Sequence, residues 1–180
     1  MPVIKDGGTG NTARVNAANQ LLVRAIVEPE IEDASEGGQA YTWTSGDLDI
    51  DAGDTMLLVK NTSDTNFHVT TIVLSGGNVA TRYLVHFPST DVTVAGTTVV
   101  GVNLNTGSAN VAEATAASDE TGNVFAQANV INDVSLLATT SFTLHTEGIL
   151  LAKNKSIAVD QVAESTAGSV TIVGHYEQAE

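Results

Sequence analysis

Short stretches rich in Val, Ile, Thr and aromatic residues recur from Gln39 to the end of the chain, and turn-forming clusters such as Ser75–Asn78 separate them. Such stretches at regular spacing are typical of the strands of an antiparallel sandwich or barrel. The expected strands cover residues 41–44, 48–50, 56–59, 67–74, 79–87, 97–104, 130–137, 142–151, 156–162 and 169–176. The sequence therefore predicts an all-β fold, an antiparallel β-sandwich or jelly roll over residues 39–180.

Two hydropathy patterns distinguish these strands. Tyr41 and Trp43 alternate with threonines, which predicts a strand with one buried and one wet face. Residues 56–59 are continuously apolar, which predicts a strand covered on both faces. Charged residues make up only 16% of the chain, and helix is expected only in the short segments 13–20 and 109–117.

The first 38 residues differ from the rest. They contain Pro2, Pro29 and five glycines, and their apolar residues are too scattered to form a core. The acidic stretch 28–36 ends in two glycines and is expected to be a linker. We therefore divide the chain into an extended N-terminal arm with its linker, residues 1–38, and a β-sandwich domain, residues 39–180.

Charge and composition exclude several classes of protein. The formal net charge of the chain is −14; residues 1–24 carry +2, so the other 156 residues carry −16. An acidic body of this kind repels nucleic-acid phosphates. The chain has no cysteine for disulfides or thiolate sites. It has neither an apolar run long enough for a membrane helix nor a signal-peptide pattern. We expect no nucleic-acid or membrane partner.

Two motifs resemble known ligand loops but depart from them. Residues 8–13 match G-x-G-x-x-A, yet no buried strand precedes them and the domain that follows is rich in β-strands. Asp47–Asp54 resembles the opening of a calcium loop, but Ala52 and Leu58 replace its essential glycine and glutamate. An amphipathic strand with aspartates in water is the expected structure, and a weak cation site is the alternative.

The four histidines fall on four different expected strands, without metal-ligand spacing; they are His68, His86, His145 and His175. The chain also lacks a G-x-S-x-G elbow for a serine nucleophile. We predict no catalytic residue, no cofactor and no metal, and hence no enzyme. An enzyme with a cupin-like metal site built from these histidines is the alternative.

Both ends of the chain resemble small virion proteins of tailed bacteriophages. At the N-terminus the likeness rests on Asp6–Gly10, Ala13–Asn16 and Asn19–Ala25. At the C-terminus it rests on residues 148–151, 156–159 and 170–177, which are similar to the closing strands of those proteins. The likeness covers about a third of the chain.

The resemblance implies a capsid decoration, or cement, protein: a jelly-roll homotrimer, made in the host cytoplasm, on the outer surface of the phage head. Its partners would be the major capsid protein and its own sister subunits. The arm residues implied in these contacts are Lys5, Arg14, Val15, Leu21, Leu22, Val23 and Arg24. For the arm, a frayed terminus is the alternative. For the protein, the alternative is a tail, fibre or receptor-binding module that recognises host glycan, although aromatic residues are only 4% of the chain.

Overall fold

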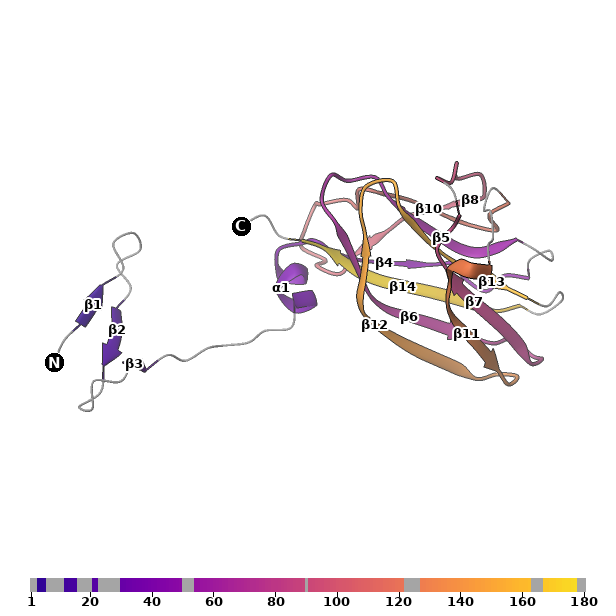
Figure 1. Ribbon diagram of the computed structural model, residues 1–180, viewed down its shortest axis with the longest axis horizontal. Coiled ribbons are helices and arrows are strands. Elements are labelled where there is room, and N and C mark those ends of the chain that lie inside the picture. Colours follow the sequence, from indigo (N-terminus) through magenta and orange to yellow (C-terminus); the bar gives the residue numbers. More distant parts are fainter. Residues whose placement is uncertain are drawn as a thin grey trace.

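The computed structural model describes residues 3–5, 12–15, 21–22, 30–49, 54–89, 91–121, 127–162 and 167–177. Within these residues, two antiparallel β-sheets pack face to face with one short α-helix beside them (Figure 1). This arrangement confirms the predicted all-β sandwich. None of the described helices is long and apolar enough to span a membrane.

The two sheets of the sandwich contain five and six strands. In order across the five-stranded sheet, the strands are β12 (Ser141–Leu151), β6 (Phe67–Ser75), β14 (Ser169–Tyr176), β4 (Ala40–Thr44) and β9 (Val102–Asn103). Across the six-stranded sheet they are β11 (Val130–Leu136), β7 (Thr81–His86), β13 (Ser156–Gln161), β5 (Thr55–Asn61), β10 (Ala114–Ser118) and β8 (Thr97–Val99). A 3-10 turn, Gln127–Asn129, precedes β11.

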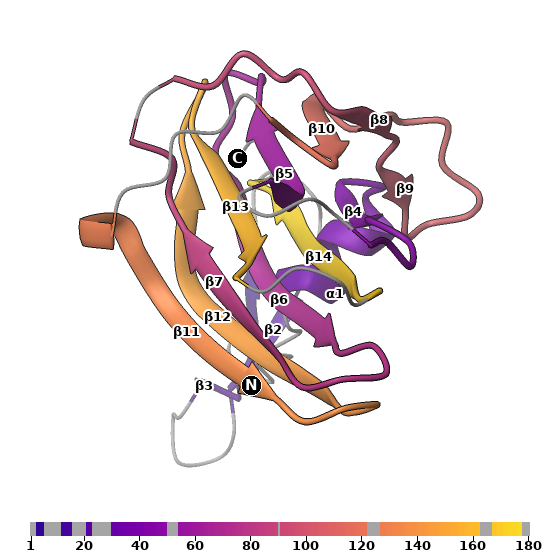
Figure 2. The same cartoon turned by 90° about the vertical axis from the view of Figure 1, so that its right-hand side faces the viewer.

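Eight of these strands are paired in the nested order of a jelly roll. The first, β4, pairs with the last, β14, and β5 then pairs with β13, β6 with β12, and β7 with β11. Such pairing is that of one long hairpin rolled up, so that its four strand pairs alternate between the two sheets (Figure 2). Strands β8, β9 and β10 are inserted between β7 and β11 and extend one side of the sandwich.

The core lies between the sheets and contains an aromatic cluster. The Trp43 and Phe67 rings meet edge to face with centroids 5.2 Å apart, and Tyr176 lies 5.0 Å from Phe67. Residues 56–59 of β5 are fully buried, as predicted for a strand covered on both faces. The outer cover is the segment around Val92, which packs against Leu58.

The helix lies where the sequence predicted a linker. Helix α1 (Glu30–Glu36) buries Ala34 and contacts β4 and β14. Acidic side chains in its first turn suit the positive end of the helix dipole, and Gly38 with φ of 70° follows its C-terminus. Part of the segment 1–38, assigned to the arm and linker from the sequence, therefore packs on the body.

Other local predictions were wrong. Residues 109–117 are not helical, because Ala114–Ser118 forms β10 between β5 and β8. Residues 13–15, expected to begin a helix, lie in a strand. Leu48 forms only a single bridge, to Gly168, where a strand was expected, and residues 50–53 lie outside the described part.

The described N-terminal residues form a small antiparallel sheet of three strands, β1 (Val3–Lys5), β2 (Thr12–Val15) and β3 (Leu21–Leu22). In its register Val3 is opposite Arg14, and Arg14 is opposite Leu22. The segment predicted to be an extended arm thus contains paired strands.

Candidate functional site

Two histidines lie side by side on the outer face of the five-stranded sheet. His68 of β6 and His175 of β14 are register partners, and their rings stack with centroids 5.1 Å apart and planes within 10°. Their chain neighbours Phe67 and Tyr176 pack in the core. Because successive side chains of a strand point to opposite faces, the histidines project away from that core.

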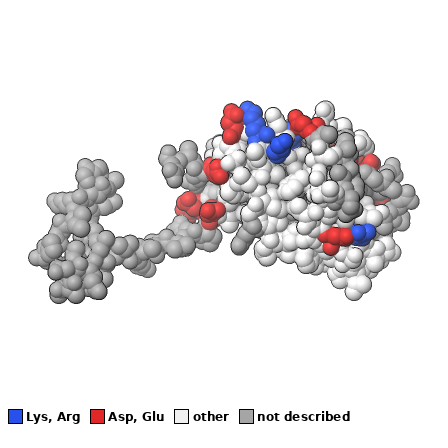
Figure 3. Space-filling view, viewed as in Figure 1, with Lys and Arg blue, Asp and Glu red and all other residues white. Residues whose placement is uncertain are grey.

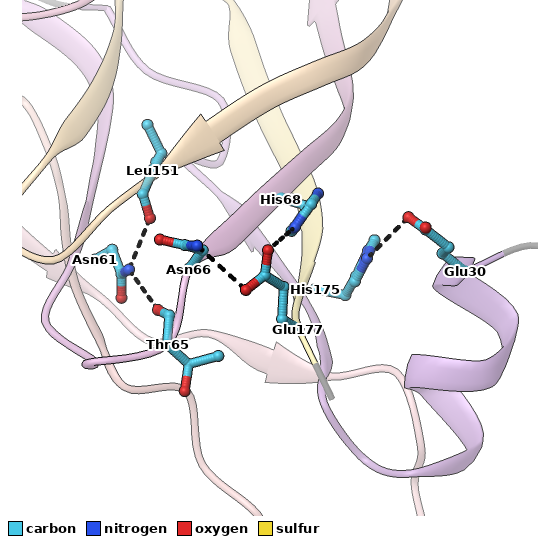
Figure 4. Close-up of polar contacts among 8 residues, drawn as sticks. All are labelled: Glu30, Asn61, Thr65, Asn66, His68, Leu151, His175 and Glu177. Carbon is cyan, nitrogen blue, oxygen red and sulfur yellow. Dashed lines mark hydrogen bonds and ion pairs between the residues drawn. The ribbon is translucent and has the colours of Figure 1, made fainter. Parts of the chain in front are cut away.

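Two carboxylates lie beside the histidines (Figure 4). Glu177 follows β14, and its Oε1 is 2.9 Å from Nε2 of His68. Its other oxygen accepts a hydrogen bond from Nδ2 of Asn66 at 3.2 Å. Glu30, the first residue of α1, places Oε2 3.8 Å from Nε2 of His175. Helix α1, strands β6 and β14 and the residue that follows β14 thus each contribute a side chain to one cluster.

The loop that carries Asn66 is held by the buried side-chain amide of Asn61. The side chain of Asn61 donates to the carbonyl oxygens of Thr65, at 2.9 Å, and Leu151, at 2.8 Å (Figure 4). These bonds tie the loop between β5 and β6 to the end of β12. Asn66 is therefore positioned to hold the Glu177 carboxylate.

Burial differs between the two histidines. His175 is 5% exposed, and its Nδ1 has no hydrogen-bond partner among the described residues. Burial lowers the pKa of His175, and His68 acts in the same direction, whereas Glu30 and Glu177 oppose the shift. The hydrogen bond from His68 lowers the pKa of Glu177. At neutral pH the His175 ring is therefore neutral and Glu177 is ionised.

The cluster opens to solvent through a hollow of about 430 Å³. Its walls are Glu30, Asp33, Ala34, His68, His175, Tyr176 and Glu177. One ligand atom each from Glu30, His68 and His175 lies within 4.8 Å of the others. We call Glu30, His68, His175 and Glu177 the histidine–carboxylate cluster; imidazole nitrogens and carboxylate oxygens in this arrangement can bind a cation.

The other two histidines lie elsewhere. His86 is fully buried on β7, with Nε2 2.8 Å from Oδ2 of Asp160, and His145 is exposed on β12. The structure therefore brings together two of the four histidines. Sequence spacing did not reveal this pair because His68 and His175 meet only through the register of β6 with β14. The available signal was the spacing His175-x-Glu177, since residues two apart on a strand lie on the same face.

A second polar cluster is buried in the other sheet and has a structural role. Asp160 accepts a hydrogen bond from Oγ1 of Thr55 at 2.6 Å. The buried Glu120 accepts the backbone N–H groups of Ala95, at 2.7 Å, and Gly96, at 2.8 Å. The bond from Thr55 joins β5 to β13, and the two bonds to Glu120 fasten residues 95–96, which follow the segment around Val92 that packs on these strands.

The calcium-like stretch and the arm residues predicted from the sequence do not belong to the histidine–carboxylate cluster. Asp47 and Asp49 are exposed, and the middle of the calcium-like stretch lies outside the described residues. Lys5, Arg14, Val15, Leu21 and Leu22 lie in β1–β3 by their backbone, and Val23 and Arg24 lie outside the described residues.

The aromatic residues that a glycan site would need on the surface are mostly inside. Tyr41 and Tyr176 border a hollow of about 700 Å³ together with Glu113, yet these tyrosines are only 1% and 4% exposed. Trp43 is 1% exposed and Tyr83 is fully buried.

No protein-family model, curated protein or solved structure matches this chain at a significant level. Its class is therefore defined by its own residues: a jelly-roll β-sandwich with a histidine–carboxylate cluster beside α1.

Proposed function

We propose that the protein is a virion structural protein that decorates the head of a tailed bacteriophage. It binds the outer surface of the shell as a trimer and reinforces contacts between major capsid proteins. The observation that carries the proposal is the combination of a phage-like N-terminal segment with a jelly-roll body. The C-terminal segments of the resemblance lie in β12, β13 and β14, and the last two are interior strands of their sheets.

A β-sandwich with this core suits a load-bearing role. The two sheets share one continuous cluster of buried side chains, so a force on one sheet is transmitted directly to the other. Three such bodies in a trimer repeat each shell contact three times, and multivalency then raises the apparent affinity without new contacts.

The body also presents apolar side chains that an assembly would cover. Val100 is 76% exposed, Val102 60% and Val111 79%, and all three lie on or near the edge strand β9. The side-chain amide of Asn103 donates to the carbonyl oxygen of Asn110 at 3.1 Å, which holds this segment together. Exposed apolar patches of this kind mark interaction surfaces. We assign them to contacts with the shell or a sister subunit.

The charge distribution favours a protein partner over nucleic acid. Figure 3 shows acidic residues near α1 and basic residues lying next to acidic ones. Lys60 pairs with Asp91 at 2.6 Å and Lys153 with Asp64 at 2.7 Å. Arg82 forms a two-pronged ion pair with Asp133. Cations already neutralised in this way provide little attraction for phosphates.

In this proposal the N-terminal segment is the anchor. Lys5, Arg14 and Arg24 supply positive charge for an acidic neighbour, and Val15 with Leu21–Val23 supplies apolar contact area. The acidic body would be held to the shell through this segment.

The test uses heads that lack the protein, mixed with the purified full chain and imaged by cryo-microscopy. We expect density on the outer surface of the head, and light scattering should give the mass of three chains. Deleting residues 1–24 should leave the thermal unfolding of the body unchanged and lower its occupancy on heads.

Matched substitutions distinguish the basic residues of the arm from those of the body in the same experiment. Arg14→Ala with Arg24→Ala should reduce occupancy, whereas Lys153→Ala with Lys155→Ala on the body should not. A monomer at micromolar concentration, or undiminished binding after the deletion, would contradict the proposal. Density on the tail, with binding on a glycan array, would instead favour the receptor-binding alternative.

A further inference from the structure

We propose that the histidine–carboxylate cluster binds one divalent transition-metal ion of the zinc class, and that this ion fastens helix α1 to β6 and β14. The inference stands on the geometry of the body and does not depend on a capsid role.

The distances are close to those of a metal site. Zinc bonds of 2.0–2.2 Å in tetrahedral geometry place neighbouring ligand atoms roughly 3.3–3.6 Å apart. Oε2 of Glu30 and Nε2 of His175 are already 3.8 Å apart, and the three ligand atoms with that of His68 lie within 4.8 Å of one another. Closing this gap requires a movement of about 1 Å by the ligand side chains.

The side chains that must move are the exposed ones. Those of Glu30 and Glu177 are 84% and 46% exposed, so they can rotate toward an ion without disturbing the core. The two imidazoles are instead held by adjacent interior strands of one sheet, with their rings stacked. A nitrogen lone pair lies in the plane of its ring, so the two parallel, stacked rings cannot both bind one ion as they stand. The His68 side chain, which is 27% exposed, must therefore turn toward the buried His175, and the carboxylates complete the site.

The hydrogen bonds of His175 also leave a place for an ion. Nε2 of this ring lies 3.8 Å from Oε2 of Glu30, which is too long for a hydrogen bond. A metal ion between His175, His68 and Glu30 would supply a partner at Nε2.

The donor set selects the kind of metal. Two imidazole nitrogens with carboxylate oxygens suit zinc, cobalt, nickel and copper, whereas calcium and magnesium prefer sites made entirely of oxygen. The chain has no cysteine, so thiolate does not contribute. Glu177, now hydrogen-bonded to Nε2 of His68, becomes the fourth ligand when that nitrogen binds the ion.

The ion would have a mechanical consequence. Helix α1 has seven residues, of which Ala34 is buried, and so short a helix is unstable without tertiary contacts. A metal bond from Glu30 to two strands of the sheet would hold its first turn in place. It would therefore fix to the body the point at which residues 1–29 are attached.

The test is a zinc titration of the untagged full chain after treatment with a chelator. Calorimetry should show one zinc ion per chain, and the melting temperature should rise by about 5–10 °C at zinc concentrations a hundredfold above Kd. Calcium and magnesium at the same concentrations should cause no rise.

Four variants locate the ion. His68→Ala and Glu30→Gln, both at accessible positions, should fold and lose the zinc-dependent rise. Glu32→Gln, an exposed acid on the same helix, and His145→Ala, an exposed histidine on β12, should keep it. The inference is overturned if the unchanged protein shows no zinc-dependent rise. It is also overturned if Glu30→Gln or His68→Ala retains the rise, or if the two control variants lose it as well.

Discussion

Gly174 precedes His175 on β14, and its replacement by alanine tests how closely β14 and β6 must approach. A Cβ atom at this position would overlap the carbonyl oxygen of His68 and lie 2.5 Å from Cζ of Phe67. The register of the two strands also shifts between Val173 and Gly174. Gly174→Ala must therefore push β6 and the Phe67 ring away from β14.

The cost follows from the size of the overlap. Carbon contacts are optimal at about 3.5–4.0 Å, so the ring must move by about 1 Å. Overpacking a close-packed core costs about 1–3 kcal/mol. Because one of the clashing groups here is the backbone of an interior strand, we expect the upper value, about 3 kcal/mol. In a domain of this size that cost lowers the melting temperature by about 6–12 °C.

The assay is thermal unfolding followed by circular dichroism, with Gly107→Ala as the matched control. At Gly107 a Cβ atom would lie 3.4 Å from the Asn105 side chain, an ordinary contact in an exposed turn. The control should melt within about 3 °C of the unchanged protein, because a tolerated alanine stabilises slightly through the unfolded chain. A Gly174→Ala protein that melts as high as the control would refute the argument from close strand approach.

Burial should also decide how much stability depends on two carboxylates, Asp160 and Asp133, and on the hydroxyl of Tyr83. Asp160→Ala removes the carboxylate that contacts Thr55 and His86, and we expect urea denaturation to show a loss of about 3 kcal/mol. Asp133→Ala breaks the exposed pair with Arg82 and should leave the denaturation midpoint nearly unchanged, so equal losses would contradict the burial argument. Burial raises the pKa of Tyr83 from 10.0 to about 12, so the unfolded chain loses this proton first. The stability due to the neutral hydroxyl is complete below pH 10 and is lost as the pH rises from 10 to 12. Over this window the denaturation midpoint should fall more steeply for the unchanged protein than for Tyr83→Phe, and parallel curves would contradict the assignment.

Most strands of the body could be predicted from the sequence because alternation of apolar and polar residues is a local property. The expected strand 67–74 corresponds to β6 and the expected strand 169–176 to β14. The continuous apolar run 56–59 also predicted correctly that β5 is covered on both faces.

Local preference failed where tertiary contacts decided the conformation. The alanine-rich segment 109–117 has helix-forming residues, yet part of it is a strand because β5 and β8 offer hydrogen-bonding partners on both sides. Conversely, the acidic stretch that includes 30–36 resembles a solvated linker, yet it forms α1 because Ala34 packs against the sheet.

The sequence by itself determined an all-β body, its main strands and the division between apolar and wet faces. Only the tertiary structure decided which strands pair, and with them the histidine–carboxylate cluster. His68 and Glu177 are 109 positions apart and meet because rolling up the long hairpin places β6 beside β14 in one particular register. Register depends on the packing of the whole core, since a shift by one residue would turn every side chain of a strand to the opposite face.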